Sequence, residues 1–246
     1  MRLIIAGCEY SGTTTLAFAL AEWGKAAFGR DGWELNGFHD HWKFPHVNNF
    51  QVPATEEEIA AVIAEHSDAR DGDWSRTGLS EEEQQMVLGL NPKLKEMFQR
   101  YHLQYHLHPS FYKAPDHIMV GAHIEEAIYG PLYFGYGAAG QYADRGVAAR
   151  HYEEQILDLA PDTVLVLVKA SPEAIAWRME DNPHHNGVLL PKDIKTVLGR
   201  FEEEHEASLL RYKVAIDTSD ATVQGSLEEL ISKIRPFMPD ADRERM

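Results

Sequence analysis

The chain has 246 residues, of which 44% are apolar and 25% are charged, as is ordinary for a globular protein. Its net charge of −16 arises from 39 acidic against 23 basic side chains. A surface this acidic repels nucleic-acid polymers and anionic membranes at long range. No apolar run reaches the roughly 20 residues that a membrane helix needs. We therefore expect a small-molecule substrate, and neither a nucleic-acid polymer nor a membrane as partner.

The single cysteine, Cys8, excludes a disulfide within the chain and is typical of a reducing compartment. The chain begins directly in an apolar run and lacks the pattern of a signal peptide. We expect a cytoplasmic protein, and we leave a homodimer open as its oligomeric state.

Short apolar runs alternate with helical patterns along the chain. The expected strands cover residues 2–7, 33–38, 117–123, 162–170 and 213–219, and the expected helices cover 14–28, 55–69, 80–90, 92–108, 145–160, 171–179, 191–210 and 226–238. Two of these helices begin with capping-box spacing, Thr55 with Glu58 and Ser80 with Glu83. The alternation predicts an α/β fold with a parallel sheet and right-handed crossovers. We expect one domain over 1–246, with a helical insertion near 54–110 and a frayed tail.

The first predicted strand leads into GCEYSGTTT, residues 7–15. Gly7, Gly12 and Thr14 match the phosphate-binding motif G-x-x-x-x-G-K-[ST], but Thr13 replaces the lysine. Backbone N–H groups at such a helix N-terminus bind phosphate or sulfate, and the hydroxyl of the motif binds Mg²⁺. We prefer this reading to a tight turn without a ligand. The expected cofactor-binding residues are Gly7, Ser11, Gly12, Thr13, Thr14 and Thr15, with Thr14 as the metal ligand.

Three further segments resemble thymidylate-kinase-like P-loop kinases. APDTVLVLVKASPEAIAWRM (160–179) is similar to a strand and helix of that family, in which Pro-Asp leads the strand and an arginine follows. VGAHIEEAIYGPLYFGYG (120–137) resembles the family's third strand, and VAIDTSDATVQGSLEELI (214–231) its closing strand and helix. The resemblance implies a three-layer P-loop fold. It also implies transfer of a phosphoryl group from ATP or another nucleoside triphosphate, with Mg²⁺, to a nucleoside, a nucleotide or a similar small acceptor.

The resemblance also implies roles for individual residues. Catalytic roles are implied for Asp40 as the base, for Glu125, and for Arg178, which directly precedes a lid near 180–193. Substrate-binding roles are expected for His39, His41, Lys43, Glu126 and Tyr129. This chain departs from the family in its loop, where the lysine is missing, and in the missing arginine beside Glu125. Its lid is also poor in arginine, so His184, His185 and Lys192 have to help neutralise the charge of the transferred phosphoryl group there.

Other interpretations stay open beside the kinase. The first loop is also similar to G-C-P-R-S-G-T-T-L-L of bacterial sulfotransferases, which lack the lysine, although Tyr10 replaces their basic residue. A nucleotide-binding protein without catalysis is a third interpretation. The histidine-rich stretch HDHWKFPH (39–46) has no established metal spacing, and we favour an acceptor pocket there. The aromatic residues of 129–136 either stack on a planar acceptor or belong to the core.

Overall fold

The computed structural model describes residues 1–28, 38–39, 80–107, 109, 112 and 116–245. Its strands are β1 (Arg2–Gly7), β2 (Phe38–His39), β3 (His117–Val120), β4 (Val164–Lys169) and β5 (Tyr212–Asp217). They form a parallel sheet in the order β2-β3-β1-β4-β5. The described helices are α1 (Thr13–Phe28), α3 (Glu81–Leu88), α4 (Pro92–His106), α5 (Ala122–Tyr129), π-helical η5 (Gly130–Phe134), α6 (Arg145–Leu159), α7 (Pro172–Asp181), η6 (Pro191–Asp193), α8 (Ile194–Ala207), α9 (Val223–Ile234), η7 (Arg235–Phe237) and α10 (Asp240–Arg245).

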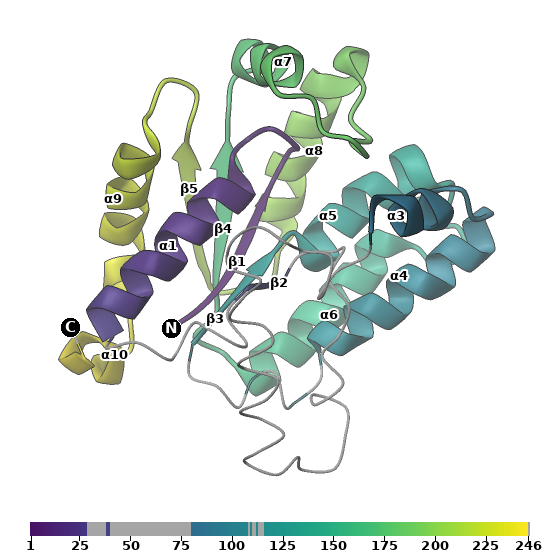
Figure 1. The fold of residues 1–246 in the computed structure, drawn as a ribbon. Helices are drawn as coiled ribbons and strands as arrows, with labels where there is room; N and C mark the ends of the chain where they lie inside the picture. The colour runs from purple at the N-terminus through teal and green to yellow at the C-terminus, as the bar shows by residue number, and fades with distance from the viewer. Residues whose placement is uncertain (29–37, 40–79, 108, 110–111, 113–115, 246) are drawn as a thin grey trace.

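Helices cover both faces of the sheet (Figure 1). In β1, Leu3 and Ile5 belong to a buried cluster with α1 and α9, whereas Ile4 and Ala6 belong to a second cluster with α5 and α8. Because both faces of the strand are buried, its sequence is continuously apolar rather than alternating. The result is the three-layer α/β architecture that the sequence predicts.

The parallel register brings the carboxyl ends of the strands to one edge. Ile5 of β1 lies opposite Val120 of β3 and Val166 of β4. The turns that follow these strands therefore lie side by side, and in parallel α/β sheets this is the edge where ligands bind. The loop between β1 and α1, residues 7–14, stands at its centre (Figure 1).

Several predicted boundaries differ from the structure. The expected third strand ends at Val120, because Gly121 and Ala122 take positive φ angles of 74° and 51° and turn the chain into α5. The expected frayed tail is wrong: residues 240–245 form α10, and the buried Asp242 lies 2.8 Å from the amino group of Met1.

The structure describes only part of the predicted insertion. The capping box that predicts a helix start at Ser80 is present at the beginning of α3. The predicted helix over 55–69 lies outside the described residues. No helix among those described is long and apolar enough to cross a membrane.

Candidate active site

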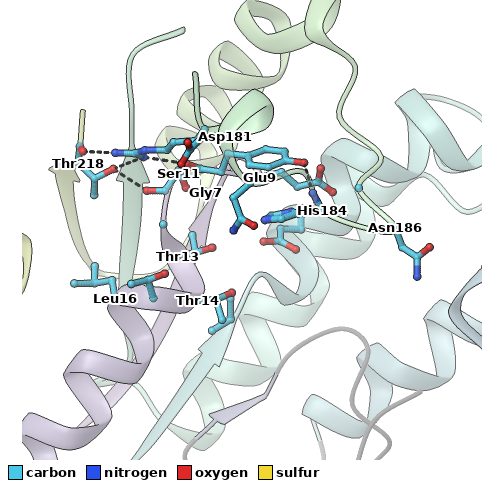
Figure 2. Close-up of a pocket in the computed structure, with 18 of the residues that line it drawn as sticks. Gly7, Glu9, Ser11, Thr13, Thr14, Leu16, Asp181, His184, Asn186 and Thr218 are labelled. Atoms are coloured by element: carbon cyan, nitrogen blue, oxygen red, sulfur yellow. Dashed lines mark hydrogen bonds between the residues drawn. The ribbon is translucent and has the colours of Figure 1, made fainter. Parts of the chain in front are cut away.

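A cleft of about 620 Å³ opens at the carboxyl edge of the sheet (Figure 2). Its wall combines the β1–α1 loop, the beginning of α5, the end of α7 and the turn after β5. All six predicted cofactor-binding residues line it, Gly7, Ser11, Gly12, Thr13, Thr14 and Thr15. Glu125, Tyr129 and Arg178, three further predicted site residues, line the same cleft. The structure thus brings together residues that are more than 160 positions apart in the sequence.

The β1–α1 loop leaves polar groups directed at this cleft. The first turn of α1 contains Thr13, Thr14 and Thr15 and no acidic residue, so its free N–H groups and the helix dipole favour an anion. The Oγ atom of Ser11 is fully buried and has no hydrogen-bond partner among the described residues. A buried hydroxyl without a partner is costly, which makes Ser11 a strained position in this loop.

Arg178 of α7 fixes the conformation of this loop. Its guanidinium donates to the carbonyl oxygen of Tyr10 at 2.9 Å and to the hydroxyl and carbonyl of Thr218 at 3.1 and 2.5 Å. Thr218 in turn donates to the carbonyl of Ser11 at 2.7 Å. Tyr10 has a φ of 66°, which is rare for a residue other than glycine and is retained only where surrounding contacts impose it. Arg178 and Thr218 supply those contacts.

Tyr129 holds the other side of the loop. Its hydroxyl oxygen accepts the backbone N–H of Glu9 at 3.0 Å, and its ring packs against Phe201. The side chain is buried, which raises its pKa well above the usual value, so the hydroxyl stays neutral. Burial, with the nearby Glu9 and Glu125 carboxylates, also raises the pKa of the Cys8 thiol to about 12. The structure therefore places both residues as packing and positioning groups, and a contact of Tyr129 with substrate stays a prediction.

Glu125 lies where the cleft meets a smaller adjoining cavity, since it lines both. Its carboxylate folds back over Gly121, so closely that a Cβ at position 121 would lie 2.2 Å from the Glu125 Cδ atom. The backbone N–H of Gly121 donates to Ile5 of β1 at 2.8 Å. The turn after β3 thus fixes a carboxylate beside the loop that begins α1.

A buried carboxylate on α6 holds the first turn of α5. Glu153 lies 3.3 Å from the Nε2 atom of His123 and accepts hydrogen bonds from the Ser208 hydroxyl at 2.6 Å and the Leu209 N–H at 2.8 Å. Burial alone would raise the pKa of Glu153, but the contacts with His123, Ser208 and Leu209 lower it on balance. Glu153 therefore stays ionised and ties the end of α8 to the beginning of α5.

Glu126, a predicted substrate-binding residue, lies in the smaller cavity and is part of an ion cluster. Its carboxylate accepts from Arg145 Nε at 3.0 Å and from the Tyr136 hydroxyl at 2.6 Å. Arg145 also pairs with Glu96 of α4 at 3.0 Å, and all three ionic side chains are buried. Glu126 is thus held by Arg145 of α6, and its predicted contact with substrate stays a prediction.

Residues 182–190, named the lid segment below, connect α7 to η6 and line the cleft with His184 and Asn186 (Figure 2). They lie within the lid that the sequence predicts near 180–193, and their function as a lid stays a prediction. Asn186 of the lid segment donates to the Gln84 side chain at 2.9 Å, and its His185 lies 3.2 Å from Glu81, both on α3. The lid segment also contacts the β1–α1 loop, through Glu9 and Tyr10. The insertion and the loop are therefore joined by the lid in this conformation.

The remaining predicted residues fall at or beyond the limits of the described chain. His39 lies in β2, whereas Asp40, His41 and Lys43 lie outside the described residues, and their roles stay predictions. Within the described ranges, no group of three histidine, cysteine or acidic side chains is arranged to hold a metal ion. The oxygen atoms of Thr14 and Glu125 in the cleft are of the type that Mg²⁺ prefers, once phosphate oxygens complete its ligands.

Sequence reasoning missed Glu9, Tyr10, Asn186 and Thr218 as parts of the site. The positions of Glu9 and Tyr10 inside the glycine loop were a usable signal. Asn186 lies within the lid predicted near 180–193, but its contact with Gln84 had no signal; for Thr218 the sequence offers none, because its contacts join segments that only the fold brings together.

Comparisons with known proteins support the fold. No protein-family model matches the chain, and no curated protein does. A deoxyadenosine kinase from M. mycoides with bound dCTP is similar, with 13% identity, a TM-score of 0.53, and coverage of 96% of this chain and 100% of that chain. The same enzyme with bound dATP gives 13% identity and a TM-score of 0.50, with the same coverage. At this identity the likeness shows the fold, which is the P-loop kinase-like α/β fold.

Proposed function

We propose that this chain is a P-loop kinase that transfers the γ-phosphoryl group of a nucleoside triphosphate, such as ATP, to a small-molecule acceptor such as a nucleoside or nucleotide. The observation that carries the proposal is the shared cleft. There the N-terminal end of α1, whose first turn holds Thr13, Thr14 and Thr15 and no acidic residue, lines the same cleft as the Glu125 carboxylate. An anion site and a carboxylate side by side are what phosphoryl transfer to a hydroxyl requires.

The residues divide the chemistry between them. The N–H groups of the β1–α1 loop and of the first turn of α1 bind the donor phosphates, and Thr14 is the residue suited to hold Mg²⁺. Bound Mg²⁺ would neutralise charge on the phosphates. We assign the base to Glu125 in place of Asp40, the base that the resemblance implies, because Glu125 lines the cleft and Asp40 lies outside the described residues. Glu125 accepts the proton of the acceptor hydroxyl while the hydroxyl oxygen forms a bond to the γ-phosphorus. The bond from that phosphorus to the bridging oxygen breaks, and the nucleoside diphosphate leaves.

The smaller cavity beside Glu125 supports an acceptor on that side. It is lined by Gln99 and His102 of α4, by Ala122 and by Phe134 of η5, so that it combines hydrogen-bonding and aromatic groups. At about 30 Å³ this cavity admits only one edge of a planar polar acceptor, whose body would lie in the larger cleft. The predicted residues Asp40, His41 and Lys43 follow β2, which is the edge strand next to β3. We propose that they complete the acceptor site.

Calorimetric titration with ATP and with GTP, each with Mg²⁺, tests the donor. We expect binding of at least one of them below millimolar concentration, and weaker binding by the Thr14→Ala variant in Mg²⁺ but not in its absence. No binding of either nucleotide at millimolar concentration would contradict the proposal. Tighter binding of adenosine 3′,5′-bisphosphate than of ATP would favour a sulfotransferase, and binding without any transfer would favour a nucleotide-binding protein without catalysis.

A further inference from the structure

The lid segment is fastened to the β1–α1 loop by two side chains of the loop itself. The Glu9 carboxylate accepts the consecutive N–H groups of Val188 and Leu189, both at 3.1 Å. The Tyr10 hydroxyl oxygen accepts the N–H of His184 at 2.9 Å. These contacts hold the lid over the loop that is expected to bind the donor phosphates.

Tyr10 holds the ring of His184 as well as its backbone N–H. The His184 ring stacks on the ring of Tyr10, with 4.0 Å between the ring centres and 17° between their planes. Gly187 permits this approach, because a Cβ there would lie only 3.2 Å from a Glu9 oxygen and 3.3 Å from the Tyr10 hydroxyl. Since Arg178 fixes the backbone of Tyr10, the direction of the stacked imidazole is set by the loop.

Among the residues that the structure describes, the other cationic groups near the cleft are engaged in hydrogen bonds or ion pairs, or lie outside its lining. Arg178 uses both terminal nitrogens to hold Tyr10 and Thr218. His185 is 74% exposed and lies 3.2 Å from Glu81. Lys192 is not among the residues that line the cleft. In contrast, no hydrogen bond or ion pair engages the ring nitrogens of His184 within the part of the chain that the structure describes, and His184 lines the same cleft as Thr13 (Figure 2).

Building on the proposed function, we propose that His184 is a catalytic residue that supplies to the donor phosphates the hydrogen-bond donor and positive charge that Thr13 cannot supply, and that Tyr10 is its positioning residue. During transfer, negative charge is spread over the oxygens of the moving phosphoryl group. A preoriented imidazole N–H stabilises that charge, and it does so more strongly when the imidazole is protonated.

Most of the charged groups around His184 among the described residues are acidic. The cleft places the carboxylates of Glu9 and Asp181 on its loop and helix sides, Glu81 on the side of α3, and Glu125 on the side of α5. The arginine in this lining, Arg178, is engaged with Tyr10 and Thr218. Donor phosphates would add further negative charge beside the ring.

The test is the affinity for ATP with Mg²⁺, measured by calorimetry from pH 5.5 to pH 8.5, the range in which histidines titrate. We expect the wild-type chain to bind about tenfold more tightly at the acid end than His184→Ala does, with the two converging as pH rises. His184→Lys, which is charged throughout, should bind tightly over the whole range. His151→Ala is the matched control, because His151 is an exposed histidine on α6 outside the cleft, and it should behave as wild type.

Two further variants separate positioning from direct contact. Tyr10→Phe keeps the stacked ring but removes the oxygen that accepts the His184 N–H, and should cost a few-fold in affinity with the pH profile retained. Tyr10→Leu removes the stack and should flatten the profile as His184→Ala does. Adding Thr13→Lys to His184→Ala should restore affinity at all pH values.

The possible failures are distinguishable. The inference is overturned if His184→Ala keeps the affinity and pH profile of the wild-type chain, or if His185→Ala rather than His184→Ala loses them. Failure of the wild-type chain to bind ATP or GTP at any pH overturns the proposed function itself.

Discussion

The two strand-to-helix turns beside the cleft are both strained, and each is held in place by a side chain from a different helix. Both place a residue other than glycine at positive φ, Tyr10 at 66° after β1 and Ala122 at 51° after β3. The turn after β1 is fastened from α7, where the Arg178 guanidinium bonds to backbone and hydroxyl oxygens. The turn after β3 is fastened from α6, where the buried Glu153 contacts His123. Strain in each turn is thus maintained by a charged side chain from elsewhere in the sequence.

The difference between the turns matches their proposed tasks. The turn after β1 presents the N–H groups at the start of α1 to an anion, and its support, Arg178, itself lines the cleft. The turn after β3 presents a carboxylate, and its support is buried away from the cleft. The conformation of the first turn should therefore change when a ligand binds, whereas that of the second should stay the same.

The largest effect should come from the carboxylate of the second turn. Glu125→Gln keeps the shape of the side chain but removes the base, so phosphoryl transfer should fall about 10²- to 10⁴-fold, the usual contribution of general base catalysis. The affinity for ATP measured by calorimetry should stay within a few-fold of wild type. Asp40→Asn is the comparison variant, and a larger loss with it than with Glu125→Gln would move the base to Asp40.

Removing the support of the second turn should mainly affect stability. Glu153→Gln removes the carboxylate that His123 and Arg150 contact, although Arg150 keeps its pair with Glu204, and losing hydrogen bonds to a charged group costs about 1.5–3 kcal/mol. Because folding lowers the pKa of Glu153, its contribution is full above the ordinary value of about 4.5 and is lost as pH falls through the lower folded value. Urea unfolding at pH 7 and pH 4 should show a smaller difference for the variant than for wild type; an equal difference in both would contradict this.

A glycine substitution tests whether the second turn really positions Glu125. Gly121→Ala inserts a Cβ into the Glu125 carboxyl group and should reduce transfer about 10- to 100-fold, the range expected when a catalytic group is displaced. Gly140→Ala is the matched control, because Gly140 has a similar φ of 72° but open space around it. Both variants should lose about 1–2 kcal/mol of stability from backbone strain. Equal activity in the two would show that Glu125 is not held by this turn.

The smallest of these effects should come from the support of the first turn. Arg178→Met removes hydrogen bonds to Tyr10 and Thr218 and should cost about 2 kcal/mol of stability, as is usual for hydrogen bonds to charged groups. The affinity for ATP should fall about tenfold, because the loop loses its fixed conformation. Bound ATP should recover part of the lost thermal stability. An affinity equal to wild type would show that the loop does not depend on Arg178.

The first turn could be predicted from sequence and the second could not. The segment GCEYSGTTT predicts a loop between a buried strand and a helix, and residues of this segment line the cleft. VGAHIEE reads as a strand that runs on to residue 123, because its alternation of small and apolar residues hides the turn at Gly121. Glu125 was selected by a resemblance to a family and not by any local signal.

The contacts that hold the residues of the site in place were also beyond the sequence. The contact of Glu9 with the lid segment and that of Arg145 with Glu126 span 180 and 19 positions, and no periodic pattern specifies them. The sheet order, by contrast, agrees with the predicted alternation of strands and helices, because burial of continuous apolar strands on both faces leaves few arrangements.

The central claim is that the two turns together move a phosphoryl group. Its most direct test is to incubate the wild-type chain with Mg²⁺ and ATP or GTP labelled at the γ-phosphate, together with a panel of nucleosides and nucleotides. We predict labelled product from at least one acceptor, with the signal abolished in Glu125→Gln although that variant still binds ATP. Binding of the donor with no labelled product from any acceptor, in wild type and variant alike, would contradict the claim.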